Sequence, residues 1–280
     1  MTSAEAPRPE TDLPRPATPG RSRPPRAAGR APGQTADRLC VESRSRSATD
    51  ELLRGLRDEG WGITAWSHFL GRATLRSIRQ AIHHAPALAE ATALHAGLAV
   101  AAHPRHRRWV AASWLLTVTH LGMLENRRTL GPANVLTLIR ANLPAMEDRL
   151  GPSLPMLALA TDFLDGRISR ATGTETPFGR YADFLADAAL WNWYAARHEP
   201  SRWLRIAGLA AWVLPIAAVA TSSFAGARMK DVPRSPWIRP AAALEILLGA
   251  RALQRTIRSR QTGRLDISRK GIGIRPIRAK

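Results

Sequence analysis

The chain has 280 residues, 45% of them hydrophobic, and a formal net charge of +19 at pH 7. This length accommodates one large or two modest domains with a sizeable core. The basic excess indicates an anionic partner, either nucleic acid or an anionic membrane leaflet. Nine tryptophans against two tyrosines favour the membrane, because indole rings prefer its interface. Cys40 is the single cysteine, which excludes an intramolecular disulfide, and we expect no redox chemistry.

Residues 1–50 are rich in Pro, Arg, Ser, Ala and Gly and lack the apolar run of a signal peptide. We expect a disordered basic tail held near anionic lipid. A nucleic-acid-binding arm is less favoured, because no aromatic residue is available to stack on bases.

Residues 51–130 predict an amphipathic, interfacial helical region. The stretch to about residue 84 places Leu, Trp, Phe and Ile among arginines at helical spacing, as in a helix on a membrane surface or against a core. Two apolar stretches follow at residues 85–102 and 109–124. Each is short for a crossing of about 20 residues and contains Glu90, His95 or His120. We expect both to lie in or on the membrane without crossing it.

Residues 131–254 predict an all-α, polytopic integral membrane bundle. We expect helices at residues 131–146, 152–166 and 179–196, each crossing the membrane. A clear span follows at residues 206–224, which hold no charge, and a doubtful one at residues 240–253. Arginines at positions 167, 170, 180, 228, 234 and 239 place the two loops that contain them in the cytoplasm. Residues 255–280 predict a flexible basic tail.

Aspartates lie within this apolar region at helical spacing. Asp162, Asp165, Gly166 and Ser169 share one helical face, and so do Gly179, Asp183 and Asp187. Burying a charged carboxylate beside apolar residues costs on the order of several kcal/mol of free energy unless a cation neutralises it.

The four carboxylates favour a hard divalent ion such as Mg²⁺, which prefers oxygen ligands and usually retains phosphate oxygens. We therefore expect a substrate that carries phosphate. Gly166 leaves room for this substrate, and Arg170 is able to pair with its phosphate oxygens. A single Asp pair of this spacing would better suit a helix cap or a solvated face. The EF-hand pattern is missing, so a calcium loop is not expected.

The order Asp162-x2-Asp165-Gly166-x2-Ser169-Arg170-x8-Gly179-x3-Asp183-x3-Asp187 resembles the signature of the CDP-alcohol phosphotransferases, integral membrane enzymes of phospholipid synthesis. Ser169 stands where that family usually has Ala. Upstream, Asn134, Thr137 and Arg140 are similar to the start of the family's first membrane helix. The resemblance covers about residues 133–224, and the parts of the chain outside it depart from the usual six-helix pattern.

The resemblance implies transfer of a substituted phosphoryl group, often phosphatidyl, from a CDP-linked donor to an alcohol, with release of CMP. Asp162, Asp165 and Asp183 would bind Mg²⁺ or Mn²⁺, with Asp187 completing the cluster and acting as the general base. Gly166, Ser169 and Arg170 would line the nucleotide and pyrophosphate site, and Gly179 would allow close approach of its helix. A homodimer is a further expectation from the family.

The sequence leaves the acceptor alcohol open. Arg140, Arg180 and Arg197 are candidates for binding a phosphorylated acceptor, and a lipid-headgroup role suits each equally well. The alternative to an enzyme is a non-catalytic membrane scaffold or CDP-lipid-binding paralogue, which the divergent ends of the chain favour. Nucleic-acid binding by the basic tails ranks last. The abundance of Ala and Arg suggests a bacterial plasma membrane, with the site facing the cytoplasm.

Overall fold

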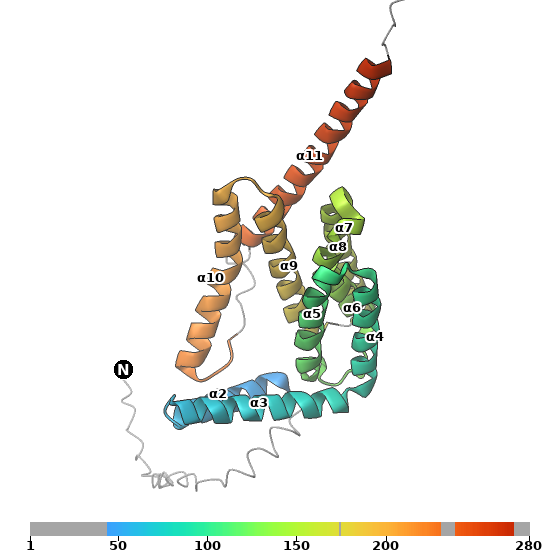
Figure 1. Cartoon of the computed structure of the whole chain (residues 1–280). Coiled ribbons are helices and arrows are strands. Elements are labelled where there is room, and N and C mark those ends of the chain that lie inside the picture. Colours follow the sequence, from blue (N-terminus) through green and yellow to red (C-terminus); the bar gives the residue numbers. More distant parts are fainter. Residues whose placement is uncertain (1–43, 174, 231–238, 272–280) are drawn as a thin grey trace, which may run out of the picture.

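The computed structural model describes residues 44–173, 175–230 and 239–271, and every regular element in these ranges is a helix (Figure 1). The all-α prediction is thereby confirmed. The N-terminal part contains α2 (Ser45–Asp58), α3 (Ile63–His83), α4 (Ala85–Ala101), α5 (Arg107–Thr119) and the short 3-10 turns at Pro104–His106 and Leu121–Leu124. The predicted tail at residues 1–50 falls outside the described residues except at its end, where α2 already begins.

The remaining helices form the bundle that holds the aspartates. They are α6 (Gly131–Ala141), α7 (Glu147–Leu150), α8 (Leu154–Thr172), α9 (Pro177–His198), α10 (Arg202–Gly226) and α11 (Arg239–Gly271). The short helix α6 packs against both α8 and α9. A core of Leu154, Leu190, Trp191, Trp212 and Leu248 joins α8 and α9 to α10 and α11. Burial of these large apolar side chains drives the packing.

Local signals fix the two ends of the connection between α8 and α9. Helix α8 ends at Gly173, whose φ of +57° lies in the left-handed region that glycine adopts readily. Helix α9 begins after Thr176, whose hydroxyl oxygen accepts a 3.0 Å hydrogen bond from the Gly179 amide, and Pro177 occupies its first turn. The connection is therefore short, and the two helices that carry the aspartates are neighbours.

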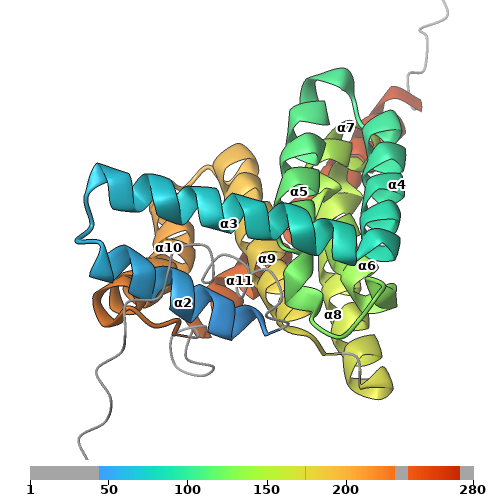
Figure 2. The same ribbon diagram turned by 90° about the horizontal axis from the view of Figure 1, so that it is seen from below.

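Helices α2 and α3 lie across the end of the bundle at which α10 ends (Figures 1 and 2). Trp61 and Trp66 pack on Phe224 near the end of α10, with ring centroids 6.1 and 5.8 Å apart respectively. Helix α2 buries Ala48, Leu52 and Leu56 against its neighbours. Since these residues recur every fourth position, α2 is amphipathic. It begins at Ser45, within the predicted tail.

Helix α10 is the only helix in the described ranges that is long and apolar enough to cross a membrane. Only 17% of its most apolar stretch is buried within the protein, which suits a lipid-facing helix better than a core helix. The predicted span at residues 206–224 lies within it. Helix α6 has 11 residues and rises about 16 Å, about half the hydrocarbon thickness of a bilayer. The expected helix at residues 131–146 is therefore divided, because α6 ends at Ala141 and a 3-10 turn at Leu143–Met146 follows it.

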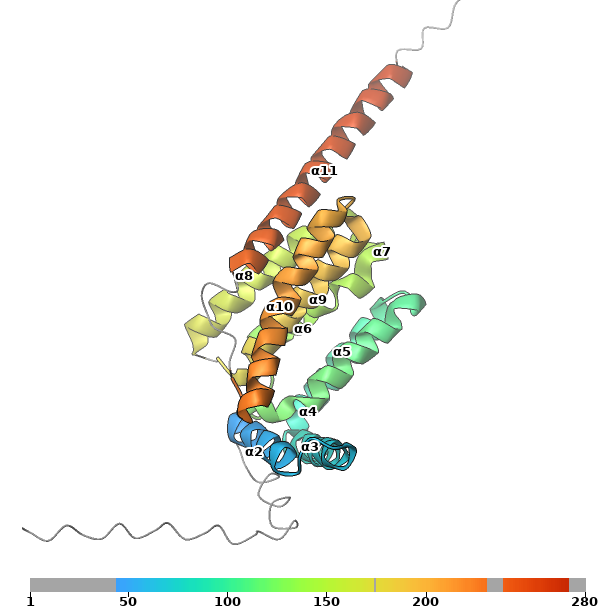
Figure 3. The same ribbon diagram turned by 90° about the vertical axis from the view of Figure 1, so that its left-hand side faces the viewer.

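Helix α11 is longer than the sequence indicated. It continues through the predicted flexible tail as far as Gly271 and projects from the bundle, as Figure 3 also shows. Residues 255–271, which the sequence suggested as a tail, are therefore helical. Residues 255–271 contain no proline, and arginine, leucine and glutamine are good helix formers, so nothing in this stretch ends the helix.

Glu199 ties α11 to the loop between α9 and α10. Its side chain is fully buried and accepts hydrogen bonds from Arg251 at 3.0 and 3.1 Å and from Arg255 at 2.6 Å. Burial alone would raise the pKa of this carboxyl, but the hydrogen bonds and charges of the two arginines outweigh it and lower the pKa overall.

We predict that Glu199→Gln lowers the free energy of unfolding by about 1–3 kcal/mol, because it leaves two arginines without their carboxylate. The pKa of Glu199 is lowered in the folded state. The extra stability of the wild type over Glu199→Gln is therefore fully present above the ordinary glutamate pKa of 4.5, and it is lost as the pH falls through the lower pKa of the folded protein. Unfolding temperatures of wild type and variant, measured in detergent from neutral to acidic pH, check the loss of stability and its pH dependence. Asp58→Asn, at an exposed side chain, is the control and should change little. Equal stability of Glu199→Gln and wild type at neutral pH would contradict the prediction.

Gly179 brings α9 close to α6. A Cβ atom at this position would lie 2.7 Å from Asn134 Oδ1, closer than real Cβ atoms come. Asn134 cannot turn away freely, because its amide donates a 2.7 Å hydrogen bond to the Leu130 carbonyl.

We predict that Gly179→Ala destabilises the protein by about 1–3 kcal/mol, because α6 and α9 must move apart. Gly97→Ala is the matched control, since nothing lies within 4 Å of its added Cβ and alanine favours the helix. Unfolding temperatures of the two variants in one detergent measure the difference. A Gly179→Ala protein as stable as Gly97→Ala would show that the contact is not restrictive.

Candidate active site

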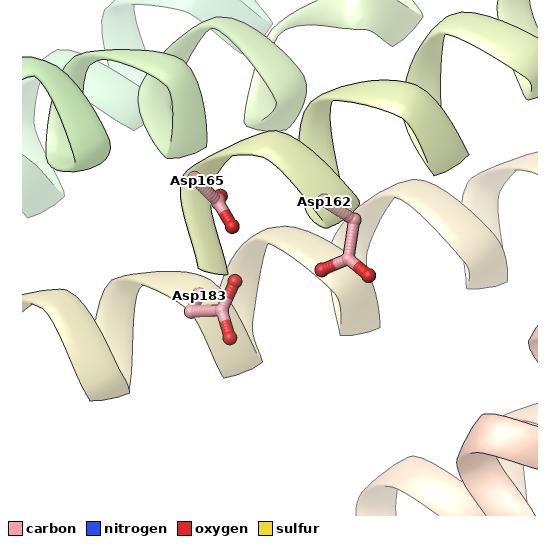
Figure 4. Close-up of side chains that lie close together, drawn as sticks. All are labelled: Asp162, Asp165 and Asp183. Carbon is pink, nitrogen blue, oxygen red and sulfur yellow. The ribbon is translucent and has the colours of Figure 1, made fainter. Parts of the chain in front are cut away.

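Four aspartates from α8 and α9 converge beside α6. Asp162 and Asp165 lie one turn apart on α8, and Asp183 and Asp187 lie one turn apart on α9. Figure 4 shows the carboxylates of Asp162, Asp165 and Asp183 directed toward one another from the two helices. One oxygen from each of these three lies within 4.8 Å of the others. The predicted convergence of the two carboxylate pairs is present.

Arg140 of α6 lies among all four carboxylates. Its Nη1 donates to Asp165 Oδ2 at 2.8 Å and lies 3.1 Å from Asp162 Oδ1. Its Nη2 donates to Asp183, and its Nε lies 2.8 Å from Asp187 Oδ1. This last contact lacks the angle of a hydrogen bond and is an ion pair. Because four carboxylates surround one guanidinium, the cluster keeps a net negative charge.

The cluster has a closed side and an open side. The Arg140 side chain is 0% exposed and the Asp165 side chain 8%, whereas those of Asp162 and Asp183 are 41% and 46% exposed. A ligand therefore reaches the carboxylates past Asp162 and Asp183, while Arg140 contacts them from within the protein.

A pocket of about 330 Å³ adjoins the cluster. Asp165 and Asp183 line it, and so do Gly166, Ser169, Arg170 and Gly179, the four residues for which the sequence suggested a nucleotide and pyrophosphate site. Asp162 and Asp187 are not part of its lining. The lining continues along α6 and the start of α9 with Ala133, Asn134, Thr137, Glu175, Thr176 and Arg180.

Side chains from two other helices lie near the carboxylates, Thr137 as a hydrogen-bond donor and Glu245 as a further negative charge. Thr137 Oγ1 donates to Asp165 Oδ2 at 2.8 Å and is itself buried. The sequence indicated Thr137 only through its similarity to the start of a membrane helix. Glu245 of α11 accepts a 2.6 Å hydrogen bond from Trp191 Nε1, and its charge interacts with those of Asp162 and Asp183. Sequence reasoning missed this role of Glu245, although a lone carboxylate in an apolar segment was the available signal.

The three arginines considered for a phosphorylated acceptor have different surroundings. Arg180 lines the pocket. Arg140 is buried among the aspartates, and Arg197 pairs with Glu147 at 2.8 Å near the far end of α9. Arg197 therefore does not lie at the site, and Arg180 is the remaining candidate of the three.

The donor set fits a divalent ion. Hard cations such as Mg²⁺ prefer carboxylate oxygens, and Asp162, Asp165 and Asp183 offer one each within a small space. No histidine or cysteine belongs to this group, which disfavours the softer metals. The three carboxylates of this group are also ones that Arg140 contacts, so an ion and the guanidinium would share the same side chains.

Residues 132–254 match the family model of the CDP-alcohol phosphatidyltransferases. The resemblance expected from the aspartate pattern is thereby confirmed, over a region that includes the cluster, the pocket and Glu245. The match supports phosphotransferase activity in general and the use of a divalent metal. Neither a curated protein nor a solved structure matches the chain significantly.

We predict that Mg²⁺ raises the unfolding temperature of the purified protein and that EDTA reverses the rise, because an ion that binds only the folded state stabilises it. At a concentration 100 times the dissociation constant the gain is about 2.7 kcal/mol. Asp183→Asn should lose most of this response. Asp148→Asn, which removes a carboxylate paired with Arg105 at the other end of the bundle, should keep it. An unchanged response in Asp183→Asn would exclude Asp183 as a ligand.

Proposed function

We propose that the CDP-alcohol phosphatidyltransferase domain of this chain is an active membrane phosphotransferase. It moves a substituted phosphoryl group, in phospholipid biosynthesis a phosphatidyl group, from a CDP-linked donor to an alcohol and releases CMP. The observation that carries the proposal is the convergence of four aspartates from two helices beside a pocket that has room for phosphate groups. A scaffold would not need four carboxylates at one place in an apolar bundle, because their mutual repulsion is costly.

In this proposal Asp162, Asp165 and Asp183 hold Mg²⁺ or Mn²⁺, with Asp187 completing the cluster. The bound ion would supply positive charge next to the pyrophosphate and the departing CMP. Arg170, Ser169 and Gly166 line the nucleotide and pyrophosphate site. Gly179 keeps α9 close enough to α6 for the pocket to retain its shape.

The transfer itself exchanges one phosphorus–oxygen bond for another. The acceptor oxygen bonds to the phosphorus that carries the lipid, and the bond from that phosphorus to the CMP oxygen breaks, with its electron pair leaving on CMP. Asp187 takes the proton of the acceptor hydroxyl as general base. The position of Asp187 on the buried side of the cluster limits the access of water to the reacting group.

We further propose that residues 131–254 form a polytopic membrane domain, preceded by an interfacial region at residues 51–130 and flanked by basic tails at residues 1–50 and 255–280. Large apolar side chains are exposed on its helices, including Phe163 of α8, Leu185 of α9, Leu214 of α10 and Ile246 of α11. Exposure of this kind over adjacent helices suits contact with lipid.

The distribution of arginines supports a site that faces the cytoplasm. Arg167, Arg170 and Arg180 lie at the end of α8 and the start of α9. The orientation of membrane proteins follows the number of arginines and lysines in short loops, with little effect of acidic residues. Three arginines beside this one loop are therefore typical of a cytoplasmic loop.

The partners that we propose are a CDP-linked lipid donor, an alcohol acceptor and membrane lipids, with no nucleic acid. A homodimer is proposed from the family resemblance. Arg180 lines the pocket and would contact the phosphate of a phosphorylated acceptor. We assign the protein to a bacterial plasma membrane.

The test is Mg²⁺-dependent release of CMP from CDP-diacylglycerol by membranes that contain the protein, with a panel of alcohols. We expect release with one alcohol and a loss of at least about 100-fold in Asp183→Asn, because a ligand to the charge-neutralising ion is missing. Asp187→Asn should lower turnover by about 10²–10⁴-fold as the base is removed. Asp148→Asn is the control and should keep the wild-type rate.

The outcomes separate the candidate functions. Full activity of Asp187→Asn would overturn its assignment as the base. Saturable binding of the CDP-lipid without release of CMP, by protein shown to be folded and inserted, would favour the scaffold or lipid-binding alternative over the enzyme.

A further inference from the structure

Arg140 occupies the position that a cation must fill if the four aspartates are to lie together without a metal ion. It is the residue that contacts all four carboxylates, through three different nitrogens. Its side chain is 0% exposed, so water does not share in neutralising it. The guanidinium remains charged at any accessible pH, and it is therefore a permanent counter-ion inside the bundle.

The contacts of Arg140 are too many for all of them to be optimal. A guanidinium presents its donors in a fixed plane, and a carboxylate satisfies it best in a two-pronged pair. Here none of the four carboxylates forms a two-pronged pair of hydrogen bonds with Arg140, and the Nε contact with Asp187 lacks hydrogen-bond geometry. The guanidinium thus holds the carboxylates together by charge more than by directed bonds.

The divalent ion of the proposed function would use the same carboxylates. Asp162, Asp165 and Asp183 each offer one oxygen to a possible ion, and Arg140 contacts all three side chains. A cation bound to these carboxylates lies within a few ångströms of a like charge, and at that range repulsion is strong even at the effective dielectric of a protein surface. Guanidinium and metal ion therefore compete most directly for the exposed carboxylates of Asp162 and Asp183, and share the buried ones.

From this geometry we propose that Arg140 is a positioning residue that substitutes for the divalent ion. In the absence of metal it keeps α6, α8 and α9 together by neutralising the carboxylates. When the ion binds, it displaces Arg140 from Asp162 and Asp183, the two carboxylates on the open side, while Arg140 keeps its contacts with the buried Asp165 and Asp187. Arg140 thus lowers the affinity for metal and protects the site when metal is scarce. The inference rests on the proposed function only in taking a divalent ion as the occupant.

The test measures unfolding temperature as a function of Mg²⁺ concentration for the full-length protein in detergent, which needs no substrate. Without metal, Arg140→Gln should unfold about 5–10 °C below wild type, because four carboxylates lose their counter-ion. Its half-saturating Mg²⁺ concentration should be at least about tenfold lower, because the competing charge is gone. At saturating Mg²⁺ the difference in unfolding temperature should shrink.

Arg140→Lys covers the case in which Arg140→Gln does not fold. A lysine keeps the charge, but its compact ammonium cannot contact four carboxylates at once, so half-saturation should fall severalfold. Arg197→Gln is the control, since it removes an arginine from an ion pair away from the site, and its half-saturation should equal that of wild type.

The result that would overturn the inference is a half-saturating Mg²⁺ concentration in Arg140→Gln and Arg140→Lys that equals or exceeds that of wild type. Absence of any Mg²⁺ response in wild type would overturn both this inference and the metal site of the proposed function. A lowered half-saturation in protein that releases no CMP with any alcohol would support the inference while contradicting the proposed function.

Discussion

The structure depends on keeping four carboxylates together inside a bundle of apolar helices. Such a group is stable only next to positive charge, and the chain provides it with the buried guanidinium of Arg140. This requirement explains why the short helix α6 packs between α8 and α9, why Thr137 directs its hydroxyl to Asp165, and why Gly179 lacks a side chain where α6 and α9 meet. The same few residues of α6, α8 and α9 therefore determine both the packing of these helices and the neutralisation of the carboxylates.

The other helices contact the bundle at its side and at its ends. Helix α11 closes one side through Trp191 and Glu245, and the two arginines that hold Glu199 tie it to the loop before α10. At the other end, Trp61 of the α2–α3 turn and Trp66 of α3 pack on Phe224. The residues outside the family match thus contact the matched region through aromatic rings as well as through ion pairs such as Arg105 with Asp148 and Arg255 with Glu199.

Much of this arrangement was predictable from spacing. The periodicity of the aspartates predicted their convergence, and the apolar run at residues 206–224 predicted α10. What spacing could not supply was the identity of partners from distant helices. From the sequence, Arg140 was a candidate for binding a phosphorylated acceptor, and Glu245 was only a charged residue within a doubtful membrane span. Only the packing of α6 and α11 shows which carboxylates they meet. Helix α11 was underestimated because a high charge suggested flexibility, whereas the residues themselves favour a helix.

The order of the site residues along the chain has one more consequence. The cluster is complete within α6, α8 and α9, and Arg140 precedes every aspartate that it contacts. During synthesis from the N-terminus, the guanidinium is therefore already present when each carboxylate enters the apolar bundle. Neutralisation of the acidic helices therefore requires no residue of α10 or α11, which are translated later, and no metal ion.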